Sequence, residues 1–274
     1  MRLGWITDPH INFCTVITKN KLYESINKQN LDALVVTGDV AEGDIVRGVM
    51  LDIQQHVTCP IYFVLGNHDY YNMSIERVRE IMREVFSCDK DDLPKQNRAI
   101  WLPAVGQQDF VELTSDVALC GHDGWYDGGY ANWFKSNIMM SDYQVITEFK
   151  YLYPALLFDK LQELAKESAD YVYNVLPKAF ETHNTVYLAT HVPVFPENAV
   201  YNGNVSDNNW MPHFSNKHMG DAILDVMSDY PTKQLVVLQG HSHGKANFHP
   251  TSNVTSLTGF ARYRQPMLNN IFEI

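Results

Sequence analysis

The sequence predicts an α/β fold in which largely parallel strands alternate with helices and a second sheet accompanies the first. Short apolar runs rich in Val, Ile, Leu and aromatic residues have the length and composition of buried strands. Stretches long enough for helices separate the first three runs, which is the pattern of βαβ units. The middle of the chain holds strand-like runs without helices between them, which indicates a second sheet. We expect one domain over residues 1–274, because α/β chains of this length commonly form a single core.

The expected elements follow the apolar pattern in chain order. The five main strands are expected at residues 3–6, 33–36, 61–65, 186–188 and 235–238. Helices are expected at 19–30, 44–57 and 74–86, the last with Ser74 as its N-cap. Further strands are expected at 98–102, 110–113 and 117–120 in the middle, and as antiparallel additions at 246–249, 254–257 and 270–272. A long helical pattern covers 155–181, although Pro177 is expected to kink it or end it early.

The composition is that of an ordinary soluble globular protein, with 45% hydrophobic and 19% charged residues. Acidic residues outnumber basic ones by 32 to 21, and the formal charge of -11 disfavours broad binding to nucleic acid or to anionic membranes. No apolar run approaches the roughly 18 residues that a membrane-spanning helix needs. Neither nucleic acid nor membrane is therefore expected as a partner.

The cysteines and the first residues of the chain favour a cytoplasmic protein. The four cysteines are scattered and form no C-x-x-C pair, so we expect reduced core residues rather than a zinc knuckle or a dithiol redox motif: Cys14, Cys59, Cys88 and Cys120. The stretch Met1 to Thr7 is too short for the apolar segment of a secretion signal, and Asp8 and His10 follow it at once.

Polar residues follow each of the five main strands at the point where the apolar run ends. These ends are Thr7-Asp8-Pro9-His10, Gly38-Asp39, Gly66-Asn67-His68-Asp69, Thr190-His191 and Gly240-His241-Ser242-His243. In open α/β sheets ligands bind where loops leave the carboxyl ends of the strands, so these residues are expected to converge on one site. Each motif alone has an ordinary explanation as a turn or a helix cap, but five of them in series favour a functional site.

The residue types at these strand ends predict metal binding. Asp, His and Asn without Cys form a mixed oxygen and nitrogen donor set that suits Mn²⁺, Fe or Zn²⁺. The candidate ligands are Asp8, His10, Asp39, Asn67, His191, His241 and His243. Seven ligands are too many for one ion, so two divalent ions about 3.5 to 4 Å apart are expected. The pairs with i, i+2 spacing place both side chains on one side of extended backbone, where a pair can hold one ion or straddle two.

The series D-x-H, G-D, G-N-H-D, H and G-H-x-H, from Asp8 to His243, resembles that of the calcineurin-like metallophosphoesterases. The resemblance implies a four-layer α-β-β-α sandwich, in which two mixed sheets pack face to face with helices outside. It also implies two overlapping ligand sets that share Asp39 as a bridge. One set is Asp8, His10, Asp39 and His243, and the other is Asp39, Asn67, His191 and His241.

The resemblance further implies a mechanism. A hydroxide that bridges the metals would attack a phosphate mono- or diester, with His68 as general acid and with Asn67 and His68 in contact with the substrate. Asp69 would orient His68, and a carboxylate near a helix start is an equally ordinary interpretation. Glu42 stands where purple acid phosphatases have a ligand tyrosine, so an iron-tyrosinate enzyme is disfavoured.

Two aromatic-rich loop insertions, near residues 125–153 and 195–216, are the candidates for substrate contact. Trp125 and Tyr126 in the first insertion fit either a stacking wall for a nucleobase or core packing, and core packing is favoured. The second insertion directly follows a candidate ligand, so Trp210 is expected near the entrance, whereas His213 either contacts substrate or lies at the surface.

The predicted substrate is a small phosphate ester, with nucleotides among the candidates. Arg262 and Arg264 either contact its phosphate or face solvent. A protein phosphatase or a nuclease with the same two-metal site is the alternative, and the acidic net charge disfavours the nuclease. From a different functional class, a non-catalytic interaction scaffold is disfavoured because every ligand position is filled.

Overall fold

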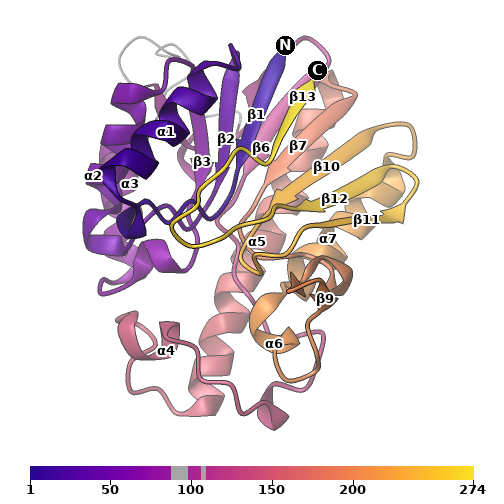
Figure 1. Cartoon of the computed structure of the whole chain (residues 1–274). Coiled ribbons are helices and arrows are strands. Elements are labelled where there is room, and N and C mark those ends of the chain that lie inside the picture. The colour runs from indigo at the N-terminus through magenta and orange to yellow at the C-terminus, as the bar shows by residue number, and fades with distance from the viewer. Residues whose placement is uncertain (88–97, 106–108) are drawn as a thin grey trace.

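The computed structural model describes residues 1–87, 98–105 and 109–274. Two large sheets pack face to face and helices cover the outer face of each, as Figure 1 shows. The predicted four-layer α-β-β-α sandwich is therefore confirmed. The two chain termini lie side by side at one end of the sandwich, where the amino group of Met1 donates a hydrogen bond to the carbonyl oxygen of Ile274 (Figure 1).

The first sheet has the strand order β13-β1-β2-β3-β4. Its strands are β1 (Arg2–Ile6), β2 (Ala33–Thr37), β3 (Ile61–Val64), β4 (Ala99–Trp101) and β13 (Asn270–Glu273). The first four run parallel, and β13 is antiparallel to β1. The expectation that the strand at 98–102 belongs to the second sheet is wrong, because β4 lies at the edge of the first. The helix before β4 supplies the crossover that lets it pair in parallel with β3.

The second sheet has the strand order β11-β12-β10-β7-β6-β5. Its strands are β5 (Val111–Glu112), β6 (Val117–Gly121), β7 (Thr185–Ala189), β10 (Gln234–Gln239), β11 (Ala246–Thr251) and β12 (Val254–Thr258). The C-terminal strands β11 and β13 are antiparallel to their neighbours as expected, but β12 runs parallel to β10. Three residues of β12 are buried and none of β11 is, so β12 takes the inner position and β11 the edge.

Helices α1 (Val16–Asn27), α2 (Gly43–His56) and α3 (Ile75–Phe86) cover the first sheet. Helices α5 (Pro154–Thr182) and α7 (Lys217–Asp229) cover the second. Ser74 is the N-cap of α3 as predicted, since its hydroxyl oxygen accepts the amide of Arg77 at 3.1 Å. Apolar side chains fill the space between helices and sheet on each side, and a further apolar layer between the two sheets includes Leu3, Trp5, Tyr187 and Leu238. These layers fix the strands, and therefore the loops that leave them.

Helix α5 continues through Pro177 to Thr182, so the expectation that this proline ends the helix is wrong. Proline cannot donate a hydrogen bond to the carbonyl oxygen of Tyr173 one turn earlier. Tyr173 lies on the exposed side of α5, where water can satisfy that oxygen. The buried side of the helix, which includes Val172 and Leu176, packs on the second sheet and keeps α5 in place.

Both aromatic-rich insertions lie beyond the end of the sandwich. Residues 125–153 contain the short helix α4 (Asp142–Val145). Residues 195–216 contain β8 (Val200–Tyr201), β9 (Asn204–Val205) and α6 (Met211–Phe214), and β8 and β9 form a hairpin. In Figure 1, α4 lies beside the N-terminal part of α5, and β9 and α6 lie on the other side of that helix.

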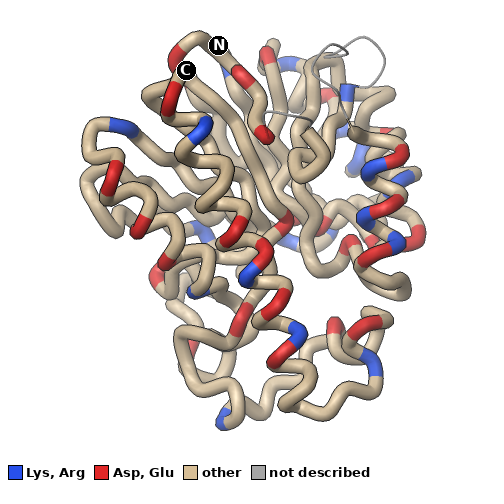
Figure 2. The backbone as a smooth tube through the Cα atoms, turned by 180° about the vertical axis from the view of Figure 1, so that it is seen from behind, with Lys and Arg blue, Asp and Glu red and all other residues tan. Residues whose placement is uncertain are grey.

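Residues of both charge signs alternate along the outer helices, as the coloured backbone in Figure 2 shows. Ion pairs such as Arg77 with Glu80 and Lys166 with Asp170 join opposite charges along these helices. In the parts of the chain that the structure describes, no helix has the length and apolar character needed to cross a membrane. Three cysteines are free thiols, of which Cys59 and Cys120 are buried and Cys14 is partly exposed; Cys88 lies outside the described residues.

Candidate metal centre

Loops from five strands meet at one end of the sandwich. Strands β1, β2 and β3 belong to the first sheet and β7 and β10 to the second, and each group runs parallel. Backbone hydrogen bonds join the loops. The amide of Asp8 donates to Gly38 (3.1 Å), that of His10 to Asp39 (3.0 Å), and that of Gly240 across to His191 (2.8 Å). The loops that carry the candidate ligands therefore lie side by side.

Five of the loop residues have a left-handed backbone, which residues other than glycine seldom adopt. The φ angles are 46° at Asp8, 40° at His10, 52° at Asp39, 65° at His241 and 61° at His243. Each such residue costs roughly 1 kcal/mol or more, so the surrounding structure must enforce the conformation. Strain concentrated on neighbouring Asp and His residues indicates a functional site rather than a set of ordinary turns.

Glycine is required beside two of these residues because no side chain fits there. A methyl group on Gly66 would collide with the carboxylate of Asp39 and with the ring of His191. A methyl group on Gly240 would collide with the carboxylate of Asp8. The glycines of the G-N-H-D and G-H-x-H motifs therefore make room for the polar cluster.

One half of the cluster joins residues from the D-x-H, G-D and G-H-x-H motifs. Donor atoms of Asp8, His10, Asp39 and His243 all lie within 4.8 Å of one another. Nε2 of His10 is 3.2 Å from Nε2 of His243 and 3.7 Å from Oδ2 of Asp39. Nε2 of His243 is also 3.4 Å from Oδ1 of Asp8. This half has the composition and compactness of a site for one metal ion.

The other half joins residues from the G-D, G-N-H-D, H and G-H-x-H motifs. Oδ1 of Asn67 lies 3.1 Å from Nε2 of His191 and 3.0 Å from Nδ1 of His241. Nε2 of His191 lies 3.4 Å from Oδ1 of Asp39. Asp39 thus directs Oδ2 toward the first half and Oδ1 toward the second. All seven candidate ligands are brought together, and Asp39 is the residue common to both halves.

Hydrogen bonds determine which ring nitrogens face the second half. Nδ1 of His191 lies 2.9 Å from the carbonyl oxygen of Thr37, and Nε2 of His241 lies 3.0 Å from that of His213. A carbonyl oxygen only accepts, so these nitrogens carry the protons. The opposite nitrogens and the oxygen of Asn67 are then all acceptors, and they face one another without a hydrogen between them. A bound cation would satisfy these lone pairs.

Burial favours the neutral form of two histidines of the cluster, His10 and His241. It lowers the pKa of His10 to about 2 and that of His241 to about 3, so both imidazoles are neutral at pH 7. His243 differs: burial lowers its pKa, but its hydrogen bond to Asp8 and the charge of Asp8 outweigh burial and raise the pKa above the usual value. Neutral imidazole is the form that binds metal, so a metal would replace a proton at His243.

The spacing of the donors fits divalent ions. Metal–nitrogen bonds of about 2.0 to 2.1 Å place two ligands on one ion roughly 3 to 3.4 Å apart. The nitrogens of His10 and His243 are 3.2 Å apart, and the contacts of Asn67 are 3.0 and 3.1 Å. Carboxylate, amide oxygen and imidazole together suit Mn²⁺, Fe or Zn²⁺.

His68 lies at the edge of this cluster and is not part of either half. Its Nε2 is 4.0 Å from Oδ2 of Asp39, and its side chain is 18% exposed toward the cavity described below. The ring stacks on Tyr71 with 4.3 Å between ring centroids, and its backbone amide donates to Oδ1 of Asp39 at 2.9 Å. Burial lowers the pKa of the His68 imidazole to about 4.

The carboxylate of Asp69 binds backbone amides instead of the His68 ring that it was expected to orient. Its fully buried carboxylate accepts the backbone amides of Ala41 at 2.9 Å and Gly66 at 2.8 Å. These bonds join the loops after β2 and β3, and His68 is held by Tyr71 instead. The carboxylate therefore supports the backbone around the cluster. Residue order alone cannot show this, because neighbouring residues in a helical turn point in different directions.

The aromatic candidates of the first insertion do not face the cavity. Trp125 and Tyr126 are 2% and 0% exposed and belong to the core, in agreement with the favoured interpretation. His213 is also buried, with its ring nitrogens 2.8 Å from the hydroxyl of Ser136 and 2.6 Å from that of Tyr143. It is neither a surface residue nor a wall of the cavity, because it is 2% exposed and its ring packs against those of Trp133 and Tyr126.

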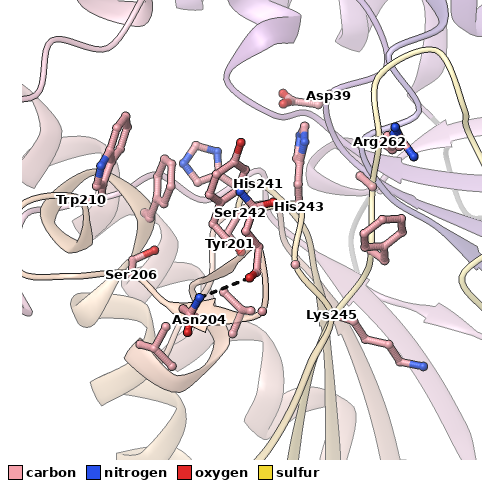
Figure 3. A pocket seen from close by; sticks show the side chains of 18 of the residues that line it. Asp39, Tyr201, Asn204, Ser206, Trp210, His241, Ser242, His243, Lys245 and Arg262 are labelled. Atoms are coloured by element: carbon pink, nitrogen blue, oxygen red, sulfur yellow. Dashed lines mark hydrogen bonds between the residues drawn. The ribbon is translucent and has the colours of Figure 1, made fainter.

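A cavity of about 1300 Å³ opens over the cluster. Its walls come from the β8–β9 hairpin, from α6 with its N-cap Trp210, and from residues 260–263, as Figure 3 shows for Tyr201, Trp210 and Arg262. Tyr263, which is not among the residues expected at the site, also lines the cavity, and its ring centroid is 4.4 Å from that of His10. It belongs to no motif, so no sequence signal marks it.

The model of the family described as calcineurin-like phosphoesterase matches residues 1–245. No curated protein matches the chain. The structure of the phosphopantetheinyl hydrolase of Mycobacterium tuberculosis is similar over 97% of this chain and 94% of its own, with 14% identity and a TM-score of 0.60. A dimetal phosphatase from Danio rerio is similar over 96% of this chain and 88% of its own, with 11% identity and a TM-score of 0.53.

Asp39→Asn is expected to lose metal, because a carboxamide has one oxygen and cannot offer an anionic oxygen to each half of the cluster. Metal content after removal of excess ions should fall from two per chain to one or none. Asp52→Asn is the matched control, since it changes an aspartate that pairs with Lys19 on the surface, and it should retain both ions. Full occupancy in Asp39→Asn would contradict the role of a shared ligand.

Proposed function

The chain belongs to the calcineurin-like phosphoesterases, and from this membership we propose that it hydrolyses a small organic phosphate ester at a two-metal centre. Membership in this family makes it a phosphoric ester hydrolase. The observation that carries the proposal is the position of Asp39. Its two oxygens face separate donor sets, and the side chain lines a cavity large enough for an organic phosphate.

The seven ligands divide between the ions by proximity. The first ion would be held by Asp8, His10, Asp39 and His243, and the second by Asp39, Asn67, His191 and His241. When bound, two such ions would lower the pKa of a water molecule and offset charge that builds on the phosphoryl oxygens. The chain itself holds the donors rigid, through strained loops and buried hydrogen bonds.

His68 is placed to assist the leaving group. It lines the cavity next to Asp39 without belonging to either donor set, so a phosphate held over the cluster would lie within reach of its ring. A neutral imidazole still carries one N–H that it can donate to the leaving oxygen. The negative charge of a bound phosphate favours the protonated form, which is the form that can act as general acid.

The walls of the cavity support a substrate with an apolar or planar organic group. Tyr201, Trp210 and Tyr263 line it and are 55%, 40% and 45% exposed, so each offers a ring face. Arg262 and Lys245 also line it and can contact a second anionic group. The volume of about 1300 Å³ exceeds what a phosphate alone would fill. A nucleotide has both features and is one member of this class.

A nuclease or a protein phosphatase would use the same chemistry on a larger substrate. The formal charge of -11 and the mixture of charges in Figure 2 disfavour a nuclease, which needs a basic groove. The β8–β9 hairpin forms one wall beside the cluster, which favours a substrate that enters the cavity over a loop of a protein surface.

The proposed function is tested by assaying metal-stripped protein with p-nitrophenyl phosphate and bis-p-nitrophenyl phosphate. Mn²⁺, Zn²⁺ and Mg²⁺ are added separately. Hydrolysis of at least one ester is expected only after metal is restored, and the preferred ester identifies the bond type. Metal-loaded protein that is inert toward both esters would favour the interaction scaffold instead.

His68→Ala is expected to lower kcat by about 10² to 10⁴, the usual contribution of a positioned general acid. Metal content should stay at two ions per chain, because His68 is outside both donor sets. His56→Ala is the control, since His56 is an exposed histidine on α2 and its removal should leave kcat unchanged. An unaltered kcat in His68→Ala would exclude the assigned role.

Trp210→Ala is expected to raise KM for an aryl phosphate by about two- to tenfold with little change in kcat, because a stacking wall binds substrate and transition state alike. Steady-state kinetics with a substrate series of increasing aromatic area would measure the effect. Tyr153→Ala removes an aromatic side chain that is 78% exposed and outside the cavity, and it provides the comparison. Equal KM values for Trp210→Ala and wild type across the series would contradict a stacking wall.

A further inference from the structure

The inserted segment 125–153 places the buried carboxylate of Asp142, at the start of α4, beside the metal centre. Backbone hydrogen bonds dock the segment on the chain that follows β3: Asn72 donates to Val145 at 3.1 Å, and Thr147 donates to Met73 at 3.0 Å. The side chain of Asp142 is 0% exposed. A carboxylate removed from water to this extent requires donors of its own.

Three donors converge on the Asp142 carboxylate. Oδ1 accepts hydrogen bonds from Nδ2 of Asn67 at 3.1 Å and from the hydroxyl of Tyr71 at 2.6 Å. Oδ2 accepts one from the hydroxyl of Tyr126 at 2.8 Å. Burial, and then the charge of Asp142, raise the pKa of both tyrosines, so the phenols remain protonated donors. The carboxylate therefore binds three side chains at once.

The contact with Asn67 determines which end of its amide faces the metal centre. A carboxylate cannot donate, so it selects the NH₂ group of the amide and leaves the oxygen directed away from it. That oxygen is the atom 3.1 Å from His191 and 3.0 Å from His241. The reversed amide would present NH₂, which has no lone pair for a metal.

The two tyrosines that donate to Asp142 also stack on histidines of the site. Tyr71 stacks on His68, with ring centroids 4.3 Å apart and planes 26° apart. Tyr126 stacks on His241, with centroids 5.8 Å apart and planes 21° apart. Asp142 thus touches three side chains, of which one is a candidate ligand, one supports a second ligand, and one supports His68.

The contacts of Asp142, direct and through Tyr126, involve ligands of only one half of the centre. Asn67 and His241 belong to the second donor set, whereas the first set has other neighbours: Tyr263 packs against His10 and His243, and the amide of His241 donates to Asp8 at 2.9 Å. A change at Asp142 should therefore act on the two halves unequally.

We propose that Asp142 is a positioning residue of the inserted segment, which fixes the amide oxygen of Asn67 toward His191 and His241 and thereby sets the metal affinity of that half of the centre. The inference rests on the proposed two-metal function. It assigns to the insertion a role in metal binding, and no residue of the insertion is itself a ligand. A partner that orients a ligand typically affects metal affinity by about 10- to 100-fold.

The test is to titrate metal-free Asp142→Ala protein with Mn²⁺ and to measure binding by isothermal titration calorimetry. Wild type is expected to bind two ions per chain. The variant should bind one ion with unchanged affinity and the other about 10- to 100-fold more weakly. Asp127→Asn is the matched control: Asp127 is a buried aspartate of the same segment, but its hydrogen bonds go to His218 and Gly129. It should retain both affinities.

A double-mutant cycle with Asn67→Ala separates positioning from general support of the fold. If Asp142 acts through Asn67, then Asp142→Ala should weaken metal binding far less in the Asn67→Ala background than in wild type. Equal losses in both backgrounds would overturn the proposal. Asp142→Asn keeps the size of the side chain, and it replaces the Ala variant if the latter does not fold; a loss of about three- to tenfold at one site is then expected.

The outcomes distinguish this inference from the proposed function. Wild-type protein that does not bind two ions would refute the two-metal centre itself. Wild-type protein that binds two ions, with Asp142→Ala or Asp142→Asn binding both equally well, would overturn only the role of Asp142. The role of Asp142 would be established by three results together. Asp142→Ala weakens metal binding at one site, Asp127→Asn does not, and the effect of Asp142→Ala is much smaller in the Asn67→Ala background.

Discussion

The site depends on a single buried carboxylate that must serve two groups of donors. Asp39 lies in the loop after β2 of the first sheet, and its oxygens face histidines supplied by both sheets. The two sheets must therefore pack with the carboxyl ends of their strands in contact. Residue 66 must be glycine, because any side chain there would collide with the Asp39 carboxylate. The backbone of Asp39 must be left-handed so that its carboxylate points into the cluster. The glycines and the strained loops are consequences of this requirement.

The core on both sides of the sheets makes such strain tolerable. Each left-handed residue costs roughly 1 kcal/mol or more, while each fully buried large apolar side chain contributes about 1.5 to 3 kcal/mol. Many such side chains, including Leu34, Phe63 and Leu188, lie in the strands that carry the loops. The lone pairs that face one another at the centre add a further cost without a cation. Metal binding should therefore stabilise the fold, which couples the function of the site to the stability of the protein.

The positions of the ligand loops could be predicted because a strand and the polar residue after it are local features of the sequence. The run 33–36 followed by Gly38-Asp39 is an example. The sheet to which β4 belongs and the direction of β12 depend on crossovers and relative burial, which a local pattern does not contain. Asp69 adjoins His68 in sequence, yet its carboxylate binds other backbone. Asp142 reaches the site only through the packing of an insertion, so no motif marks it.

The central claim is that Asp39 joins two metal sites, and anomalous diffraction from a crystal soaked in Mn²⁺ tests it most directly. The account predicts two anomalous peaks roughly 3.5 to 4 Å apart, one on either side of the Asp39 carboxylate. The first should lie among Asp8, His10 and His243, and the second among Asn67, His191 and His241. A single peak, or two peaks that do not share Asp39, would contradict it.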